Sequence, residues 1–498
     1  MSTPMERFIS ILILCLTSVQ CLIGQDFGDF PKIEKQKLWN DLDLLYQGLD
    51  KFHTGMYWYT PKDSVDEAFK MAKSKIKSDL NVLEFHKIIA PLVALSREDH
   101  TNITLPDDVK DQLREDVRFL PLTVVFLGKE LYVVKNGSDI ETLDLQGKVI
   151  ETINGETPME IVKKIGSLFA SDGFIKTVKY NDLEGFAFSS YYFYDYGQVD
   201  QFTIKLKGEK ESLQLKSLPI DSINKHLNKR YKAFKSNTQK DLLEFDLIND
   251  STAYLGIHTF SNSDINTYSK GKDLKKFLEH SFKSINEKNI KTLIVDVSEN
   301  GGGTEGNAGL LYSYFGENYQ KYIKVKAKTQ KAILDNGVDP PITLKTFGFL
   351  EKVFLNKKMK DNSYERKQWI GNGLMAYKKE AKYKFDGKVY VIISPETYSG
   401  GSEFSNMMFS NDLATFVGQE TGGGYLGNTS GYSQELVLPN SGIEIDIPAL
   451  QFVMNVAPKL PIGSGVKPHY EVVPTFEQYI HRDNAALDYI LEHLEPKK

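Results

Sequence analysis

The sequence contains almost no cysteine, with only Cys15 and Cys21 in a chain of 498 residues. Both lie inside an apolar run near the N-terminus, so a chain cleaved after that run contains no thiol. This excludes a disulfide scaffold, a cysteine-ligated zinc site and a cysteine nucleophile in the cleaved chain.

An excess of positive charge is also missing, because 61 Lys and Arg residues stand against 66 Asp and Glu residues, for a net charge of -5. Such a chain offers no large positive field to a phosphate backbone, so we expect no nucleic-acid partner. No His-Glu-x-x-His motif or comparable ligand cluster occurs among the 9 histidines. We therefore expect no metal and no organic cofactor.

A comfortable membrane-spanning run is absent as well. Residues 8–23 are apolar but short, and they follow Arg7 and precede the small residue Gly24, as in a secretory signal peptide. We expect a signal peptide over residues 1–24 rather than an uncleaved anchor, and no stable membrane insertion after its removal. The protein would then be exported, periplasmic or extracellular. The residues before Cys21 fit a lipoprotein signal poorly, which disfavours lipid anchoring.

Apolar residues are plentiful, at 41% of the chain with 26% charged, which supports folded cores in about two to four domains. Leu38, Leu42, Leu45 and Leu49 recur at helical spacing. This pattern predicts a helical N-terminal domain over residues 25–117.

The pattern changes to short alternating strands closed by Gly and Asn-Gly turns over residues 118–218. The order of strand, Asn-Gly turn, helix and strand there resembles a PDZ-like peptide-binding domain, which would take a peptide by strand addition. Residues 219–241, rich in Lys, Asn and Ser, are expected to be a connector.

Residues 242–498 have the pattern of an α/β catalytic domain. Runs typical of buried strands occur at 253–257, 292–297, 388–393 and 414–418, and they alternate with helical stretches. The predicted fold is therefore an α/β core, a mixed sheet with flanking helices, joined to a helical N-terminal domain and a PDZ-like β module.

Three segments carry residues suited to chemistry. Three glycines at 301–303 follow a buried strand, where backbone N–H groups can bind an oxyanion or simply make a tight turn. Ser399 follows another strand at the start of a helix, as a nucleophile does or as an ordinary N-cap does. His100 lies in a polar loop, where most histidines are only surface residues.

Together these segments resemble the tricorn-like branch of the C-terminal-processing serine peptidases, from about residue 38 to the C-terminus. Five motifs in sequence order carry the resemblance: Asp-His-Thr at 99–101, a strand with Asp296 followed by Asn-Gly-Gly-Gly at 300–303, Thr-Tyr-Ser at 397–399, the glycine-rich stretch 417–424, and Gly-Val-Lys-Pro at 465–468.

The resemblance implies that Ser399 is the nucleophile and His100 its general base, with a peptide or protein as substrate. The N–H groups of Gly400 and Gly302 would form the oxyanion hole. The other branch of the family uses a Ser–Lys dyad, but Gly424 occupies the lysine position here.

Two departures from the family pattern leave alternatives open. The family has an acidic residue three positions after the nucleophile, whereas here Ser402 stands there and Glu403 follows, which makes Ser402 an alternative nucleophile. The late carboxylate that orients the histidine has no clear match, and Glu444 and Asp446 are the nearby candidates.

Two other functions remain possible on these residues. A non-catalytic peptide- or ligand-binding protein can keep the fold after losing catalysis. An exported serine esterase or amidase would use the same acyl-transfer groups on a different substrate.

Overall fold

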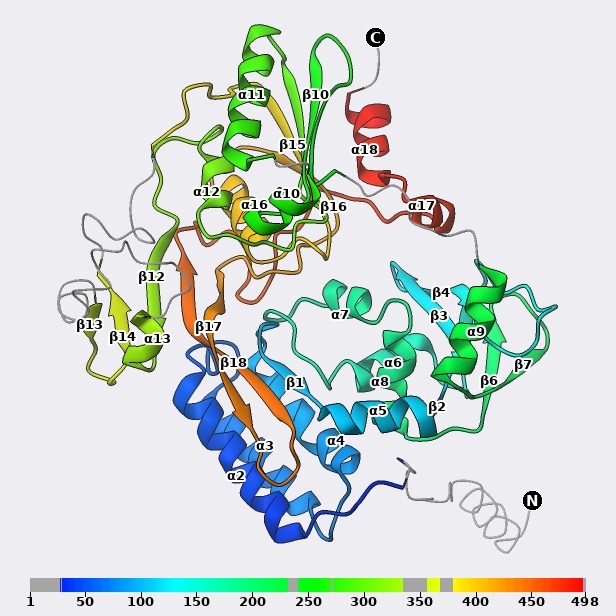
Figure 1. Ribbon diagram of the computed structural model, residues 1–498. Coiled ribbons are helices and arrows are strands. Elements are labelled where there is room, and N and C mark those ends of the chain that lie inside the picture. Colours follow the sequence, from blue (N-terminus) through cyan, green and yellow to red (C-terminus); the bar gives the residue numbers. More distant parts are fainter. Residues whose placement is uncertain are drawn as a thin grey trace, which may run out of the picture.

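The structure is a computed structural model that describes residues 27, 29–231, 241–269, 272–334, 356–367 and 379–495. These residues form a helical lobe, a β-sheet lobe beside it and an α/β lobe above both in the view of Figure 1. The predicted signal peptide, both cysteines and part of the predicted connector (232–240) lie outside the described residues.

The helical lobe confirms the helical N-terminal region that the leucine spacing predicts. Leu38, Leu42, Leu45 and Leu49 form one buried stripe along its first helix. The elements of the lobe are α2 (Lys35–Phe52), α3 (Lys62–Lys75), α4 (Val82–Val93), η1 (Ala94–Ser96), β1 (Asn102–Thr104) and α5 (Asp107–Asp116). Across the described ranges, no helix is both long and apolar enough to span a bilayer.

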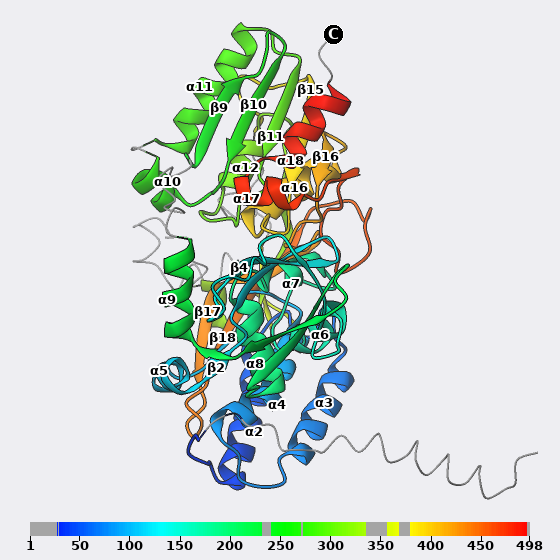
Figure 2. The same ribbon diagram turned by 90° about the vertical axis from the view of Figure 1, so that its right-hand side faces the viewer.

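A hairpin from late in the sequence completes the core of this helical lobe. Its strands β17 (Gly427–Val437) and β18 (Glu444–Met454) run from the α/β lobe down onto α2 and α4 (Figures 1 and 2). Ile443, Ile445 and Ile447 are fully buried in the same apolar cluster as the leucines of α2, and β1 pairs with β18. The helical lobe is therefore built from residues near both ends of the chain.

The β-sheet lobe contains a 5-stranded antiparallel sheet in the order β3-β4-β5-β6-β7. The outer edge of β3 is occupied by the chain itself: the Val124 N–H donates to the Gly185 carbonyl at 3.1 Å, and the Gly185 N–H donates back at 2.7 Å. A peptide therefore finds no free edge at Val124 for the strand addition expected of a PDZ-like module. The elements are β2 (Arg118–Phe119), β3 (Leu122–Leu127), β4 (Glu130–Asn136), β5 (Val149–Ile153), α6 (Pro158–Ile165), α7 (Thr177–Asp182), α8 (Ala187–Tyr196), β6 (Gln201–Leu206), β7 (Ser212–Lys216) and β8 (Leu218–Pro219).

The segment expected to be a connector begins with a helix, α9 (Ile220–Arg230). Ile223 on this helix is fully buried and belongs to the apolar cluster of the helical lobe. The first half of the predicted connector is thus a packed element, because an apolar residue within its polar sequence finds a core.

The α/β lobe has the mixed sheet that the buried runs predict. Its strand order is β19-β16-β15-β11-β10-β9, and all neighbours are parallel except β9 with β10. Helix α11 packs on one face of the sheet and α18 on the other (Figure 2). Both faces of the central strands are buried, which explains why their sequences are continuously apolar.

The elements of this lobe are β9 (Leu243–Leu247), β10 (Thr252–Ile257), α10 (Asn262–Tyr268), α11 (Leu274–Glu287), β11 (Thr292–Asp296), α12 (Asn307–Tyr312), β12 (Tyr322–Ala327), α13 (Gln330–Leu334), β13 (Asn356–Lys358), β14 (Tyr364–Arg366), β15 (Lys388–Ile393), α16 (Gly400–Ser410), β16 (Thr415–Gly418), β19 (Tyr470–Glu471), α17 (Phe476–His481), α18 (Ala485–Tyr489) and η2 (Ile490–Leu494). Strands β12, β13 and β14 extend the sheet of the β17–β18 hairpin, in the order β1-β18-β12-β14-β13.

Asp41 on α2 ties the helical lobe to the turn of the β17–β18 hairpin. Its buried carboxylate accepts hydrogen bonds from the Asn440 N–H at 3.2 Å, the Asn440 Nδ2 at 2.7 Å and the Ser441 N–H at 2.8 Å. We expect Asp41→Ala to lower the free energy of unfolding by about 3 kcal/mol, because these donors lose their acceptor. Urea unfolding would measure the change.

The control is Asp43→Ala on the same helix. Asp43 is exposed and, among the residues described, pairs with Lys73 alone, at 2.7 Å. An exposed pair of this kind contributes about 1 kcal/mol or less. Equal losses in the two variants would contradict a special role of Asp41.

Candidate active site

Ser399 lies on a sharp turn between β15 and α16. It has φ of 45° and ψ of -119°, a left-handed backbone conformation that a residue with a Cβ adopts only under strain. Neighbouring contacts impose this conformation: the Thr397 hydroxyl donates to the Val297 carbonyl at 2.9 Å, and the Tyr398 N–H donates to the Asn300 carbonyl at 3.0 Å. The turn is therefore tied to the loop that follows the neighbouring strand β11.

The glycine loop after β11 lies directly against Ser399. A Cβ placed on Gly302 would come within 2.6 Å of the Ser399 Cβ, 2.9 Å of its Oγ and 2.8 Å of the Gly400 nitrogen. Gly302 also has φ of +101°, so a side chain is excluded at this position both by space and by backbone conformation. By contrast, a Cβ on Gly301 would meet nothing within 4 Å.

The backbone donors near Ser399 differ in whether they are free. In the described part of the chain, the Gly400 N–H has no hydrogen-bond partner, as expected at the first residue of a helix. The Gly302 N–H already donates to the Asn300 Oδ1 at 2.9 Å. Asn300 is itself fixed, because it is fully buried and its Nδ2 donates to the Ile257 carbonyl at 2.9 Å.

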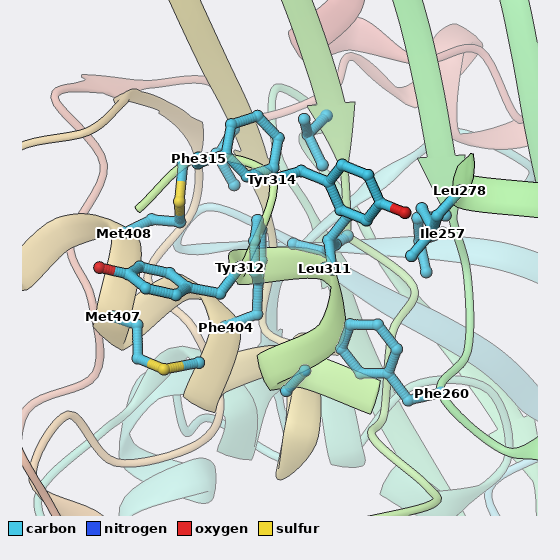
Figure 3. Close-up of a cluster of buried hydrophobic side chains, with 14 of the residues drawn as sticks. Ile257, Phe260, Leu278, Leu311, Tyr312, Tyr314, Phe315, Phe404, Met407 and Met408 are labelled. Carbon is cyan, nitrogen blue, oxygen red and sulfur yellow. The ribbon is translucent and has the colours of Figure 1, made fainter. Parts of the chain in front are cut away.

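A packed apolar core holds the helix that begins after Ser399. Figure 3 shows Phe404, Met407 and Met408 of α16 facing Leu311 and Tyr312 of α12. Helix α12 follows the glycine loop and α16 follows Ser399. The same core therefore fixes the two turns relative to each other.

Ser402, the alternative nucleophile, is buried one turn into α16. Its hydroxyl donates to the Thr397 carbonyl at 2.6 Å. A Cβ placed on Gly423 would come within 2.4 Å of the Ser402 Oγ and 3.3 Å of the Ser399 nitrogen. Gly423 therefore lies beside both residues. The hydroxyl of Ser402 is thus committed to the backbone inside the helix.

Asp172, from the β-sheet lobe, joins the His100 loop to the glycine-rich segment beside Ser399. Its buried carboxylate accepts from the Asp99 N–H at 2.9 Å and from the Gly424 N–H at 3.1 Å. Gly423, the neighbour of Gly424, lies beside Ser399, and its N–H donates to the Thr397 carbonyl of the same turn at 3.2 Å. These contacts bring a loop from the first hundred residues to the Ser399 turn, about three hundred residues later in the chain.

His100 is partly buried within this junction, and its Nδ1 has no hydrogen-bond partner in the described residues. Burial lowers the pKa of its imidazole below the ordinary 6.5, and the negative charges of Asp99 and Glu403 oppose that shift. A neutral imidazole at neutral pH, with carboxylates nearby to stabilise its cation, is suited to accept a proton.

Glu403 belongs to a buried polar cluster beside α16. Its carboxylate accepts from the Lys321 Nζ at 2.7 Å and from the Tyr322 hydroxyl at 2.6 Å, and Lys321 also pairs with Glu305 at 2.5 Å. The two carboxylates raise the pKa of Lys321 although burial alone would lower it. In the sequence, the sign of this cluster is Glu403, an acidic residue four positions after Ser399 where the family pattern has one three positions after the nucleophile.

Glu444 and Asp446, the candidates for orienting His100, lie on the exposed face of β18. They are paired in register with Thr104 and Asn102 of β1. In the part of the chain that the structure describes, neither side chain forms a hydrogen bond or an ion pair, so neither is brought to His100 by such a contact.

The carboxyl groups around the His100 loop are unusually deeply buried. Burial raises the pKa of Asp99 and of Asp172 to about 6 in each case, and it raises that of Glu98 well above its ordinary value. Among the described residues, no group of three or more His, Cys, Asp or Glu side chains is arranged to hold a metal ion.

Comparison with known families matches residues 251–472 to "Peptidase family S41". No curated protein was significantly similar to the chain. The matched segment contains Ser399 and the glycine loop, and it begins after His100 and Asp172.

Comparison with solved structures identifies a shared fold. The crystal structure of mature CPAF superposes with a TM-score of 0.59 at 14% identity, covering 92% of this chain and 96% of that one. The structure of mature CPAF complexed with lactacystin gives 0.59 and 14%, covering 92% and 97%. The photosystem II D1 C-terminal processing protease is more distant, with a TM-score of 0.38 at 12% identity over 88% and 92% of the two chains.

The buried carboxyl of Asp172 gives the stability of the fold a testable pH dependence. Its pKa is raised from 3.8 to about 6 by burial, so the folded protein keeps a proton there that the unfolded chain has already lost. The free energy of unfolding should therefore fall as the pH rises from about 4 to about 6, by on the order of 1–3 kcal/mol from this group. We expect Asp172→Asn to flatten this decline, measured by urea unfolding at several pH values.

Asp107→Asn is the control, since Lys110 holds the pKa of the exposed Asp107 below its ordinary value. That substitution should leave the decline between about pH 4 and 6 in place. An unchanged slope in Asp172→Asn would contradict the role assigned to burial.

Proposed function

Through residues 251–472 this chain belongs to peptidase family S41 and is a serine-type peptidase; from that premise we propose that Ser399 is its nucleophile and His100 its general base. The observation that carries the proposal is the strained turn of Ser399 against Gly302, where no Cβ can be placed. A strained turn at a helix start presents a hydroxyl outward beside free backbone donors.

The reaction would proceed through an acyl-enzyme. The Ser399 Oγ attacks the carbonyl carbon of the peptide bond while His100 takes the hydroxyl proton. His100 then gives this proton to the leaving amine as the carbon–nitrogen bond breaks. Water, deprotonated by His100 in turn, attacks the acyl-enzyme, and the proton returns to the Ser399 oxygen as the acid product leaves.

The oxyanion of each tetrahedral intermediate would be held by the Gly400 and Gly302 N–H groups. The Gly400 N–H is free to do so in the structure. Because the Gly302 N–H already donates to Asn300, it would serve as a shared, three-centre donor. Such donors act strongly because they are fixed before the charge develops.

The electrostatic partners of His100 in this proposal are Glu403 and Asp99 rather than Glu444 and Asp446. Both partners stabilise the imidazolium by charge, whereas the pair on β18 is exposed. Lys321 and Tyr322 donate to the Glu403 carboxylate and hold it in one position.

Two segments outside the Ser399 region also have roles in this proposal. A signal peptide over residues 1–24 would export the protein to the periplasm or beyond the cell, and the PDZ-like module over residues 118–218 would contribute to binding a peptide or protein substrate. Asp172 gives this module a direct part in the site, because it holds the His100 loop.

One observation supports a second function, a non-catalytic peptide-binding protein. The engagement of the Gly302 N–H by Asn300 leaves Gly400 as the free donor of the proposed pair. A chain that had lost catalysis would tolerate that arrangement and keep the fold.

Labelling with a fluorophosphonate probe separates the two functions. We expect an adduct on Ser399 in the protein lacking residues 1–24, no adduct in Ser399→Ala, and weak labelling in His100→Ala, because loss of the nucleophile or base costs about 10⁴-fold or more in rate. Mass spectrometry of the labelled peptide would identify the residue. Ser402→Ala is the matched control and should keep the Ser399 adduct. An adduct on Ser402, or none in a folded protein that admits the probe, would contradict the proposal.

The two adjacent glycines provide a second test. Gly302→Ala places a methyl group against Ser399 and Gly400, so we expect labelling and peptide cleavage to fall about 10²- to 10³-fold through the displaced oxyanion donors. Gly301→Ala meets open space and should retain nearly full activity. Equal effects of the two substitutions would show that the close contact with Ser399 does not matter for the reaction.

A further inference from the structure

A pocket of about 470 Å³ lies beside the His100 loop, outside the residues assigned to the reaction. It is enclosed by α6, by α7, by the loop between them and by Arg97, which stands three residues before His100. In both Figures 1 and 2, α7 lies on the side of the β-sheet lobe that faces the α/β lobe.

The lining of the pocket is positively charged. Arg97, Lys163, Lys176 and Lys179 line it, and no carboxylate does. Within the described part of the chain, Arg97, Lys163 and Lys176 form no ion pair. The positive charge of the pocket is therefore largely without a partner, apart from that of Lys179.

Lys179 is the exception: burial and the positive charge of Arg97 lower its pKa to about 8, and the charges of Asp182 and Asp99 oppose that shift. Its ammonium group also donates to the carbonyls of Gly166 and Phe169. Lys179 thus connects α7 to the loop that follows α6 and stabilises this part of the pocket wall.

Arg97 is held in position to receive a ligand. Its backbone is left-handed, with φ of 52°, and its guanidinium carbon lies 4.4 Å from the centre of the Phe174 ring. One terminal nitrogen donates to the Gly173 carbonyl at 3.3 Å, while the buried Nε has no hydrogen-bond partner among the residues that the structure describes. A planar guanidinium with free donors, stacked on an aromatic ring, matches a carboxylate.

Apolar side chains form much of the remaining wall. Met159, Val162, Ile175 and the exposed ring of Phe174 line the pocket, together with the hydroxyl-bearing residues Ser167, Ser171 and Tyr180. A site of this kind accepts a side chain that has a methylene stem and a charged end, rather than a small inorganic anion.

Hydrogen bonds connect the pocket directly to the His100 loop. The Gly173 N–H donates to the Arg97 carbonyl at 2.9 Å, and the preceding residue, Asp172, holds the Asp99 N–H. A residue bound in the pocket therefore lies on the same short segments that position the proposed base.

We infer that this pocket is a specificity subsite that binds an acidic side chain, glutamate or aspartate, of the peptide substrate. The inference rests on the function proposed above, since it takes a peptide as the ligand. Because the chain's own Gly185 pairs with the edge of β3 at Val124, a peptide cannot pair with that edge there. We therefore expect side-chain contacts, rather than strand pairing, to recognise the peptide.

The test uses the full chain lacking residues 1–24 with Ser399→Ala, so that bound peptides are not cleaved. Fluorescence anisotropy would compare peptides identical except for Glu or Gln at one position, scanned along the sequence, each with an amidated C-terminus. At one position we expect the Glu peptide to bind about tenfold more tightly, because a charged hydrogen-bond pair is formed in a partly buried site. Added salt should reduce this preference.

Substitutions in the pocket identify where the preference arises. Arg97→Gln and, separately, the exposed Lys176→Gln should reduce the Glu preference several-fold. Lys164→Gln is the control, because Lys164 is the neighbour of the pocket residue Lys163 on α6 but pairs with Glu156 at 2.5 Å outside the pocket. Lys163→Glu combined with Lys176→Glu should reverse the preference toward a Lys peptide.

The outcomes distinguish this inference from the proposed function. A Glu preference that persists without any labelling of Ser399 supports the pocket and contradicts the peptidase mechanism. Labelling of Ser399 with no Glu preference, or with a preference that Lys164→Gln reduces equally, would overturn the pocket assignment.

Discussion

At Ser399 two turns of the backbone pass so close that a single methyl group would not fit between them. The contact between Gly302 and Ser399 joins the ends of two neighbouring parallel strands, β11 and β15, and the helices that follow them share one apolar core. Because the sheet fixes the strand ends and the core fixes the helices, the left-handed turn of Ser399 has nowhere to relax. The strain is maintained by packing, which is how a reactive hydroxyl can be held in one orientation.

The proposed mechanism also requires His100, about three hundred residues earlier in the chain, to lie near this turn. Asp172 ties the His100 loop to the glycine-rich segment beside Ser399 with a carboxylate that accepts one N–H from each side, at the cost of burying a charge. That cost appears as the raised pKa of the group. The β-sheet lobe is therefore part of the site's construction, in addition to being a neighbour of it.

The residues with local signals could be identified from the sequence, and those whose roles depend on distant contacts could not. The buried run at 388–393 coincides with β15 (Lys388–Ile393), because a strand covered on both faces is apolar throughout. Ser399 and Gly302 were recognisable from small residues after such strands. Asp172 gave no signal, since its partners lie 73 and 252 residues away and its own neighbourhood is ordinary loop sequence. The roles proposed for these residues are still predictions.

The β17–β18 hairpin has a consequence for the order in which the chain folds. The helical lobe begins near residue 35, yet Ile443, Ile445 and Ile447 are part of its core, so it cannot finish packing until nearly the whole chain has emerged from the ribosome. Contacts of such long sequence separation form slowly. The loop that carries His100 leaves this same lobe, so an incomplete chain would hold the proposed general base on an unfinished support.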